Sequence, residues 1–259
     1  MAGALSIQDI RKQFTAPNGQ RIEVLRSVSL DIVPGSFISL IGPLGCGKTT
    51  LLRLIAGLEK PSYGDLLLDG EKITAPGSEK GVVFQNHTLF PWLNIYNNIA
   101  FGLRVGKIYK HKENDVRRLI KSTGLEGFEK SFPHQLSKDI RQRASLAKGL
   151  VGHPQLLLLD EPLGALDAFT RMNMQDEMLK VWKEQSITMI MATHDVDEAV
   201  YMSDKVIVMT PRPGKVSKII DIELARPRAR SDPEFLKYRT RILNLLNFGG
   251  NIIEPNYFL

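Results

Sequence analysis

Short apolar runs that alternate with amphipathic stretches organise most of this chain. Residues 36–41 and 156–159 are continuous apolar segments of strand length, and residues 187–192 and 205–209 have the same character. Between the first two runs, residues 49–58 place their leucines and an isoleucine on one helical face. Apolar strands separated by helices are typical of a mostly parallel sheet covered on both faces. The sequence therefore predicts an α/β core.

Two further regions flank or interrupt this core pattern. Near the start, residues 5–7 and 24–32 alternate as strands do, with a turn signal at Pro17-Asn18-Gly19 between them. Residues 86–150 are helix-rich, and we interpret the first two helices of this stretch as an inserted helical subdomain that ends near the start of the third. We expect these three helices at residues 94–103, 113–123 and 139–150.

The tail after residue 225 differs in composition from the rest of the chain. It is rich in Pro, Arg and Asp, and a helix is expected over residues 233–246. The domain prediction is therefore one large domain over residues 1–225 and a C-terminal tail over residues 226–259, whose role the sequence does not reveal.

Composition narrows the class of protein. The 259 residues carry a formal charge of +6, which fits a solvated basic surface or one that rests near anionic lipid headgroups. No basic run is interleaved with aromatics, so we expect no nucleic-acid partner. The single cysteine, Cys46, cannot form an internal disulfide, which fits a reducing compartment. No signal peptide is seen, and no apolar run approaches the ~20 residues that span a bilayer, so we expect a membrane link only through a partner.

A glycine-rich loop between the predicted strand 36–41 and the predicted helix 49–58 matches the phosphate-loop pattern G-x-x-x-x-G-K-[ST]. Its glycines let backbone N–H groups turn around phosphate oxygens, and the helix N-terminus adds a positive dipole end. Lys48 is expected to reach the β- and γ-phosphates of ATP, and the Thr49 hydroxyl to ligate Mg²⁺. The predicted nucleotide-binding residues here are Gly42, Pro43, Leu44, Gly45, Cys46, Gly47, Lys48, Thr49 and Thr50.

Two adjacent acids, Asp160 and Glu161, end the apolar run 156–159. An acid at a strand end beside a phosphate loop can hold Mg²⁺, directly or through water. A second acid next to it can accept a proton from an attacking water. We therefore predict that Asp160 is a metal ligand and that Glu161 is catalytic. The alternative is a solvated strand end.

The order of these motifs resembles the ABC ATPase family over about residues 5–225. Gln85 stands where that family has its Q-loop glutamine, which implies a metal and catalytic role, and His194 resembles the family's switch histidine at the γ-phosphate. Ser137 lies in Leu136-Ser137-Lys138-Asp139-Ile140, at the place of the LSGGQ-type signature. Asp167 resembles the D-loop aspartate, and Phe14 falls where an aromatic stacks on adenine. The resemblance implies a P-loop NTPase (RecA-like) fold with an N-terminal antiparallel β subdomain and an inserted α-helical subdomain.

Two shorter segments are similar to one branch of this family. Residues 89–93 and 209–214 resemble the ATPases of importers for nitrate, bicarbonate, sulfonates and taurine. This resemblance implies an enzyme that hydrolyses ATP to drive import. It also implies transmembrane permease subunits, an extracytoplasmic solute-binding protein and a peripheral position on the cytoplasmic face of the cell membrane. Alternatives are a non-catalytic or degenerate ATP-binding subunit and a soluble ABC ATPase outside transport.

The signature segment departs from the family pattern, because Lys138 and Asp139 replace two glycines. In the family two chains sandwich two ATPs, and each signature faces the nucleotide of the other chain. A carboxylate about 4 Å from a phosphate charge would repel it by about 4 kcal/mol at an effective dielectric of about 20, which Lys138 and Mg²⁺ would partly offset. Leu44 is a second departure, because the family often has Ser there. We expect a heterodimer with a second ATPase chain of regular signature, and a homodimer remains the alternative.

Overall fold

The computed structural model describes residues 2–84, 89–106, 109–164 and 166–247. The strands are β1 (Leu5–Thr15), β2 (Arg21–Ile32), β3 (Phe37–Ile41), β4 (Tyr63–Leu68), β5 (Glu71–Lys72), β6 (Lys80–Val83), β7 (Leu156–Asp160), β8 (Thr188–Thr193), β9 (Lys205–Met209) and β10 (Val216–Asp221). The helices are α1 (Lys48–Ile55), α2 (Ile95–Val105), α3 (Tyr109–Ser122), α4 (Lys138–Leu150), α5 (Ala168–Gln185), α6 (Val196–Met202) and α7 (Pro233–Asn247), with a short 3₁₀ helix at Pro133–Gln135.

A mostly parallel sheet forms the centre of the molecule, as the apolar runs predicted. Its strand order is β10-β9-β3-β8-β7-β6, and only the β9–β10 pair is antiparallel. β3 lies between β8 and β9, so the strand that precedes the phosphate loop is central. The carboxyl ends of parallel strands share one edge of a sheet, and ligands of open α/β sheets bind outside that edge.

Alternate residues of the central strands pack into two separate cores. On β3, Phe37 and Ile41 belong to the core under α5, α6 and α7, while Ile38 and Leu40 face α1 and the N-terminal sheet. Because successive side chains of a strand point to opposite faces, a strand covered on both sides must be apolar throughout. This is why residues 156–159, all leucines, appear in the sequence as an unbroken apolar run.

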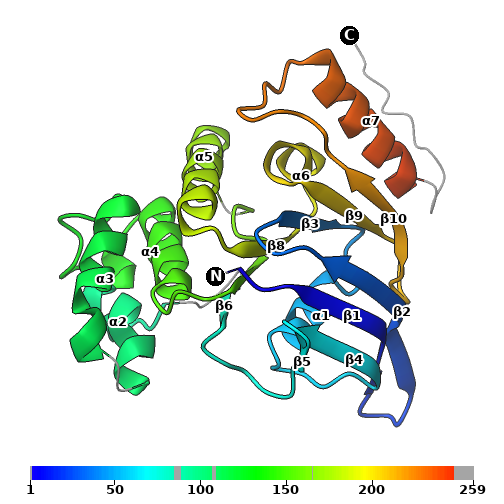
Figure 1. The fold of residues 1–259 in the computed structure, drawn as a ribbon, viewed down its shortest axis with the longest axis horizontal. Coiled ribbons are helices and arrows are strands. Elements are labelled where there is room, and N and C mark those ends of the chain that lie inside the picture. The colour runs from blue at the N-terminus through cyan, green and yellow to red at the C-terminus, as the bar shows by residue number, and fades with distance from the viewer. Residues whose placement is uncertain (1, 85–88, 107–108, 165, 248–259) are drawn as a thin grey trace.

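An antiparallel sheet of order β2-β1-β4-β5 lies over α1 and closes the second core. The predicted N-terminal strands are confirmed but are longer than expected, because β1 extends to Thr15 and β2 begins at Arg21. The added residues carry polar side chains on the exposed face, where hydrophobic alternation gives no signal. Figure 1 shows this sheet in blue and cyan at one side of the molecule.

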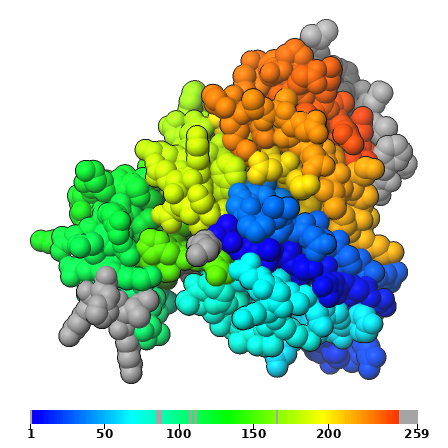
Figure 2. All heavy atoms as spheres, viewed as in Figure 1, coloured from blue at the N-terminus to red at the C-terminus, as the bar shows by residue number. Residues whose placement is uncertain are grey.

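Helices α2, α3 and α4 form a lobe that projects from the other side of the molecule in Figures 1 and 2. α4 packs on α2 and α3 and also contacts β6, so it joins the lobe to the central sheet. α2 begins at an Asn94 cap, whose side chain accepts a hydrogen bond from Asn97 N.

The C-terminal segment folds back over the central sheet. β10 pairs with β9, and α7 packs on α6 and β9, close to the helix bounds predicted from the sequence. Alternate arginines in the connection reach inward, and Arg228 donates hydrogen bonds to the backbone carbonyls of Val200 and Ser203 near the end of α6. Within the described part of the chain, none of the helices combines the length and the apolar character needed to cross a membrane.

Candidate functional site

The phosphate loop joins β3 to α1 and is shaped by glycines. Gly45 and Gly47 have φ of 77° and 104°, a backbone region that favours glycine. A Cβ on Gly47, the residue that caps α1, would lie 2.6 Å from a Leu25 methyl carbon, so no larger residue fits. Leu44 is 98% exposed at the tip of the loop, whereas Cys46 is buried beneath it. The loop therefore presents backbone and the apolar side chains of Pro43 and Leu44 to solvent at the N-terminus of α1.

Lys48 lies folded under this loop. Its Nζ donates to the carbonyl of Gly42 at 2.7 Å, and the side chain is buried. The ammonium group thus lies within the loop whose backbone amides could bind phosphates. An anion placed at the loop would give this ammonium a partner of opposite charge in place of an uncharged carbonyl, which is a stronger interaction.

Thr49 and Asp160 meet at the shared edge of the sheet, although they are far apart in sequence. Thr49 Oγ1 donates to Asp160 Oδ1 at 3.0 Å. Burial raises the pKa of Asp160, and the hydrogen bond from Thr49 opposes that rise. A hydroxyl and a carboxylate are the hard oxygen ligands that Mg²⁺ accepts, and Mg²⁺ takes its remaining ligands from water and phosphates. The donor set at this place therefore fits magnesium.

Glu161 and His194 face each other beside that pair. His194 Nδ1 lies 3.4 Å from Glu161 Oε1, and the imidazole is 66% exposed while the carboxylate is mostly covered. Glu161 N donates to the carbonyl of Ala192 at 2.9 Å, which ties the acid to the end of β8. Glu161 also has a φ of 47°, a left-handed conformation that is uncommon for a residue with a side chain. The backbone thus holds this carboxylate next to the histidine.

The signature segment lies at the N-terminus of α4. The Ser137 side chain caps the helix by accepting from Ile140 N at 3.3 Å, and Lys138 is exposed. Asp139 is engaged by Arg143, whose Nε lies 3.2 Å from each carboxylate oxygen. Arg143 also donates to Glu177 of α5 at 2.6 Å. From the sequence, Lys138 and Mg²⁺ were expected to offset the charge of Asp139, and Arg143, the partner four residues further along the helix, was missed.

The remaining predicted residues lie at different places. Phe14 is partly exposed near the end of β1, with the Lys12 ammonium 4.7 Å from its ring centroid. Thr50 is half-buried in the first turn of α1. Asp167 is the cap of α5, where it accepts from Thr170 N at 3.1 Å. Gln85 lies outside the described residues.

Sequence reasoning missed one contact to the phosphate loop. Gly214, at the end of the Pro-rich loop after β9, packs against the loop so closely that a Cβ there would lie 1.9 Å from the Cys46 carbonyl oxygen. Gly214 also bridges to Leu25 of β2. The sequence signals were a glycine next to a proline, which is common in ordinary turns, and the family resemblance of residues 209–214, and neither indicated a contact with the phosphate loop.

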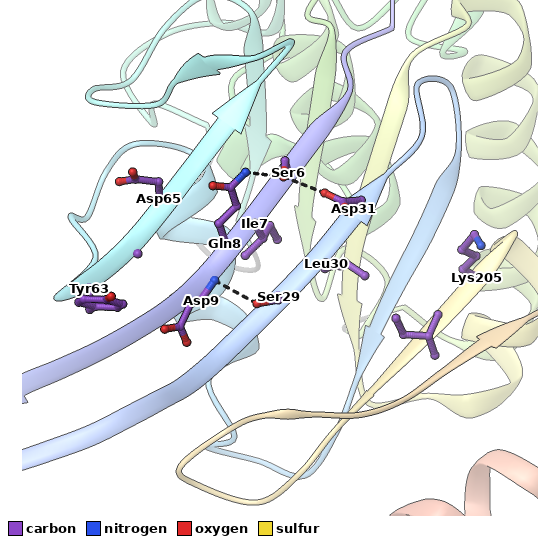
Figure 3. A pocket seen from close by; sticks show the side chains of 12 residues that line it. Ser6, Ile7, Gln8, Asp9, Ser29, Leu30, Asp31, Tyr63, Asp65 and Lys205 are labelled. Carbon is purple, nitrogen blue, oxygen red and sulfur yellow. Dashed lines mark hydrogen bonds between the residues drawn. The ribbon is translucent and has the colours of Figure 1, made fainter.

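A separate groove of about 820 Å³ lies on the antiparallel sheet (Figure 3). Its polar side chains largely bind one another: Gln8 donates to Ser6, and Ser6 donates to Asp31 at 2.7 Å. Asp9 N donates to Ser29 at 3.0 Å. Because these groups already have partners within the protein, the groove offers no converging donors or acceptors, and we assign no ligand to it.

Comparison with known proteins agrees with this geometry. Residues 25–164 match a family described as ABC transporter. The chain is 45% identical over 244 residues to the "Aliphatic sulfonates import ATP-binding protein SsuB" of Bacillus subtilis (strain 168), covering 94% of each protein. It is 43% identical over 253 residues to the "Bicarbonate transport ATP-binding protein CmpC" of Synechococcus elongatus (strain ATCC 33912), covering 94% of this chain and 38% of that protein.

The fold is similar to solved structures as well. One is a "Dimeric structure of a post-hydrolysis state of the ATP-binding cassette MJ0796 bound to ADP and Pi", with a TM-score of 0.74 and 26% identity. The similarity covers 85% of this chain and 100% of that one. The expected α/β fold, with a mostly parallel sheet and an antiparallel subdomain, is thereby confirmed.

Proposed function

The chain belongs to the ABC transporter family, and on this premise we propose that it is the ATP-hydrolysing subunit of an importer for a small anion or organic acid. The relatives named for import of aliphatic sulfonates and transport of bicarbonate support this class of solute. The observation that carries the proposal is the meeting of the phosphate loop, the Thr49–Asp160 pair and the Glu161–His194 pair at one edge of the sheet. This edge is where nucleotides bind in α/β folds.

Each residue of the site has a different role in phosphoryl transfer. The phosphate-loop amides and Lys48 bind the phosphates and stabilise negative charge that develops in the transition state. Glu161 accepts a proton from the attacking water, and His194, 3.4 Å from it, orients that carboxylate and contacts the γ-phosphate. Phe14 stacks on the adenine, and the Lys12 ammonium near its ring adds positive charge close by.

We propose that Thr49 and Asp160 hold Mg²⁺, with Gln85 from the segment outside the described residues. When bound, the ion neutralises charge on the phosphate oxygens. The Thr49 hydroxyl and the Asp160 carboxylate contribute oxygen ligands and, through their mutual hydrogen bond, fix the start of α1 against the end of β7.

The same proposal covers the organisation of the chain. Residues 1–225 form the ATPase domain, with the helical subdomain at about 86–150, and residues 226–259 form the C-terminal tail. The partners are transmembrane permease subunits and, outside the membrane, a solute-binding protein. The chain itself lies peripherally on the cytoplasmic face of the cell membrane.

We further propose a second ATPase chain as partner. Lys138 and Asp139 place side chains where two glycines would let a backbone approach the other chain's nucleotide. The Asp139–Arg143 contact removes part of the expected repulsion, but the bulk of both side chains remains. Because signatures act on the opposite nucleotide, Ser137 and Asp167 of this chain would serve the partner's ATP, and this chain's own phosphate loop would face a regular signature.

Isolation of the native complex tests these assignments. The tagged chain is purified from its source in mild detergent, and the co-purifying proteins are identified by mass spectrometry. Membrane-spanning subunits and a second ATPase chain are expected. Two copies of this chain with no other ATPase would contradict the heterodimer, and the lack of any membrane subunit would contradict the transporter assignment. Uptake of sulfonates or bicarbonate by vesicles that contain the complex then tests the solute class.

A further inference from the structure

Residues 193–195, here called the switch segment, are held by hydrogen bonds that converge on Glu198. Thr193 Oγ1 donates to Glu198 Oε2, and the same hydroxyl accepts from Asp195 N at 3.1 Å. Glu198 N in turn donates to Asp195 Oδ1 at 3.1 Å, and this bond caps the N-terminus of α6. His194 lies between the two ends of this closed set. The backbone position of His194 therefore depends on the contacts of Glu198.

Glu198 is unusual for an acid, because it is only 4% exposed. Its second oxygen, Oε1, has no hydrogen-bond partner of good geometry among the described residues. The side chain lines a small cavity of about 20 Å³ that Glu161 and His194 also line. A buried carboxyl with an unsatisfied oxygen costs stability, and a native protein that retains one often uses it at a functional site. Glu198 shares this cavity with Glu161 and His194, which indicates that it has a role at the site formed by that pair.

Several charged and polar groups surround this carboxyl. Burial raises the pKa of Glu198 to about 7, and the Asp195 carboxylate adds to the rise. The Thr193 hydroxyl, the Gln175 amide and the Arg171 guanidinium oppose it. Glu161 and His194 face it across the cavity. The group thus lies where modest changes in its neighbours would alter how firmly it holds Thr193.

One of these neighbours connects Glu198 to the C-terminal segment. Gln175 of α5 is buried, and its Oε1 accepts a hydrogen bond from Arg230. The Arg230 guanidinium also lies 3.7 Å from the centroid of the Tyr201 ring, on α6. With its oxygen bound to Arg230, Gln175 is left to present its amide nitrogen to Glu198. A chain of contacts thereby runs from Arg230 through Gln175 and Glu198 to the switch segment.

We propose that Glu198 is a positioning residue for ATP hydrolysis, which fixes His194 beside Glu161 through Thr193 and is itself held by Arg230 through Gln175. The inference rests on the proposed function, since it concerns the same hydrolysis. Glu198 does not contact the phosphate loop, which lies at the end of a different strand. Its loss is therefore expected to lower kcat while the KM for ATP stays nearly constant, as for an interaction that acts after substrate binding.

The test measures steady-state ATP hydrolysis by the purified complex that contains the full-length chain, with Glu161→Gln in this chain as the check that hydrolysis comes from this site. Glu198→Ala is expected to lower kcat by about tenfold to a hundredfold, the size of effect that a small misplacement of a reacting group produces. Glu198→Gln keeps an acceptor for Thr193 and is expected to restore most of the loss. Arg230→Ala is expected to give a smaller decrease in the same direction.

Thr193→Val removes the donor of the key hydrogen bond without changing side-chain volume, so it covers the case in which Glu198→Ala fails to fold. Thr188→Val is the matched control, because Thr188 also has a buried hydroxyl on β8 but donates to Gly3 O, away from the switch segment. Thr193→Val should lower kcat, whereas Thr188→Val should not. The double variant of Thr193 and Glu198 should be no slower than the slower single variant.

The possible outcomes distinguish failure of the proposed function from failure of the inference about Glu198. A folded, fully assembled wild-type complex that hydrolyses no ATP would overturn the proposed function and this inference with it. Normal hydrolysis that Glu161→Gln abolishes, together with a kcat unchanged in Glu198→Ala and Thr193→Val, would overturn only the inference. Equal losses of kcat in Thr193→Val and Thr188→Val would also overturn it, because they would indicate general destabilisation of β8.

Discussion

Thr49 Oγ1 donates a 3.0 Å hydrogen bond to Asp160 Oδ1 and so joins the start of α1 to the end of β7. If both oxygens hold Mg²⁺, Thr49→Ala should reduce the gain in ATP affinity that Mg²⁺ provides by about tenfold or more, since loss of even a supporting contact in a metal site has effects of this order. Titration calorimetry with ATP, with and without Mg²⁺, measures this gain. Thr49→Ser keeps the hydroxyl and should recover most of it. An equal Mg²⁺ effect in Thr49→Ala and wild type would contradict the metal assignment.

Glu161 Oε1 lies 3.4 Å from His194 Nδ1. A substitution of Glu161 tests whether this pair takes part in the chemical step. Glu161→Gln keeps the shape of the side chain but cannot accept a proton. The variant should bind Mg-ATP normally and lose about 10²- to 10⁴-fold in kcat, the usual contribution of a general base. Single-turnover hydrolysis and nucleotide binding, measured on the same preparation, separate the two effects. Unchanged turnover would remove Glu161 from the mechanism.

Sequence patterns predicted the central sheet well because its strands are buried on both faces. The runs at residues 156–159 and 205–209 had no competing interpretation once flanking helices were recognised, and both are strands in the structure. β1 was predicted only in part, because beyond Ile10 it buries no apolar side chain and its last residues, 13–15, are exposed and paired with β2. Periodicity detects burial, and it does not detect backbone pairing at an exposed edge.

The residues of the candidate site were also predicted only in part. The phosphate loop and the acids after residue 159 were visible because their chemistry is local in sequence. Contacts between separate segments were not visible, and so Gly214 against Cys46 and Arg230 against Gln175 were missed. Arg143 could have been found, because an acid and a base four residues apart on a helix are neighbours. The roles proposed for the residues of the candidate site stay predictions, which the substitutions described in this Discussion test.

Arg143 binds Asp139 and Glu177 at once, so it holds the signature segment against α5. Arg143→Ala should leave the Asp139 carboxylate free to repel the phosphates of the facing nucleotide. ATP hydrolysis by the assembled complex should fall, and the second substitution Asp139→Gly should restore part of it. Glu177→Gln, which removes the other partner, should have a smaller effect. Failure of Asp139→Gly to restore any activity would show that Arg143 acts only through the fold of α4.

Gly214 packs so closely on the phosphate loop that an added Cβ would lie 1.9 Å from the Cys46 carbonyl oxygen. Gly214→Ala should therefore displace the loop and weaken ATP binding, with the rest of the fold retained. Gly102→Ala in α2 is the control, because nothing lies within 4 Å of the Cβ it would add. Fluorescent-nucleotide binding and thermal unfolding of both variants check the prediction. Equal ATP affinity in the two variants would show that the loop adapts to the added methyl group.

Because burial raises the pKa of Glu198, the free energy of unfolding of the protein should depend on pH. Its pKa of about 7 in the folded protein exceeds the ordinary value of 4.5, so the folded state holds the proton more tightly than the unfolded state. The associated stability is fully present below the unfolded value and is lost as the pH rises to about 7. Glu198→Gln cannot titrate, so the free energy of unfolding of wild type relative to this variant should fall by up to about 3 kcal/mol between about pH 4.5 and about pH 8.

Urea unfolding of both proteins at several pH values across this window measures the difference, and taking the difference cancels the titration of all other groups. Above about pH 7 the wild type carries a buried charge that the variant lacks. The free energy of unfolding of the variant should therefore gain on that of the wild type as the pH rises. A difference that does not change with pH would mean that Glu198 ionises at its ordinary pKa. In that case the Glu198 carboxyl would ionise in the folded protein as it does in the unfolded chain.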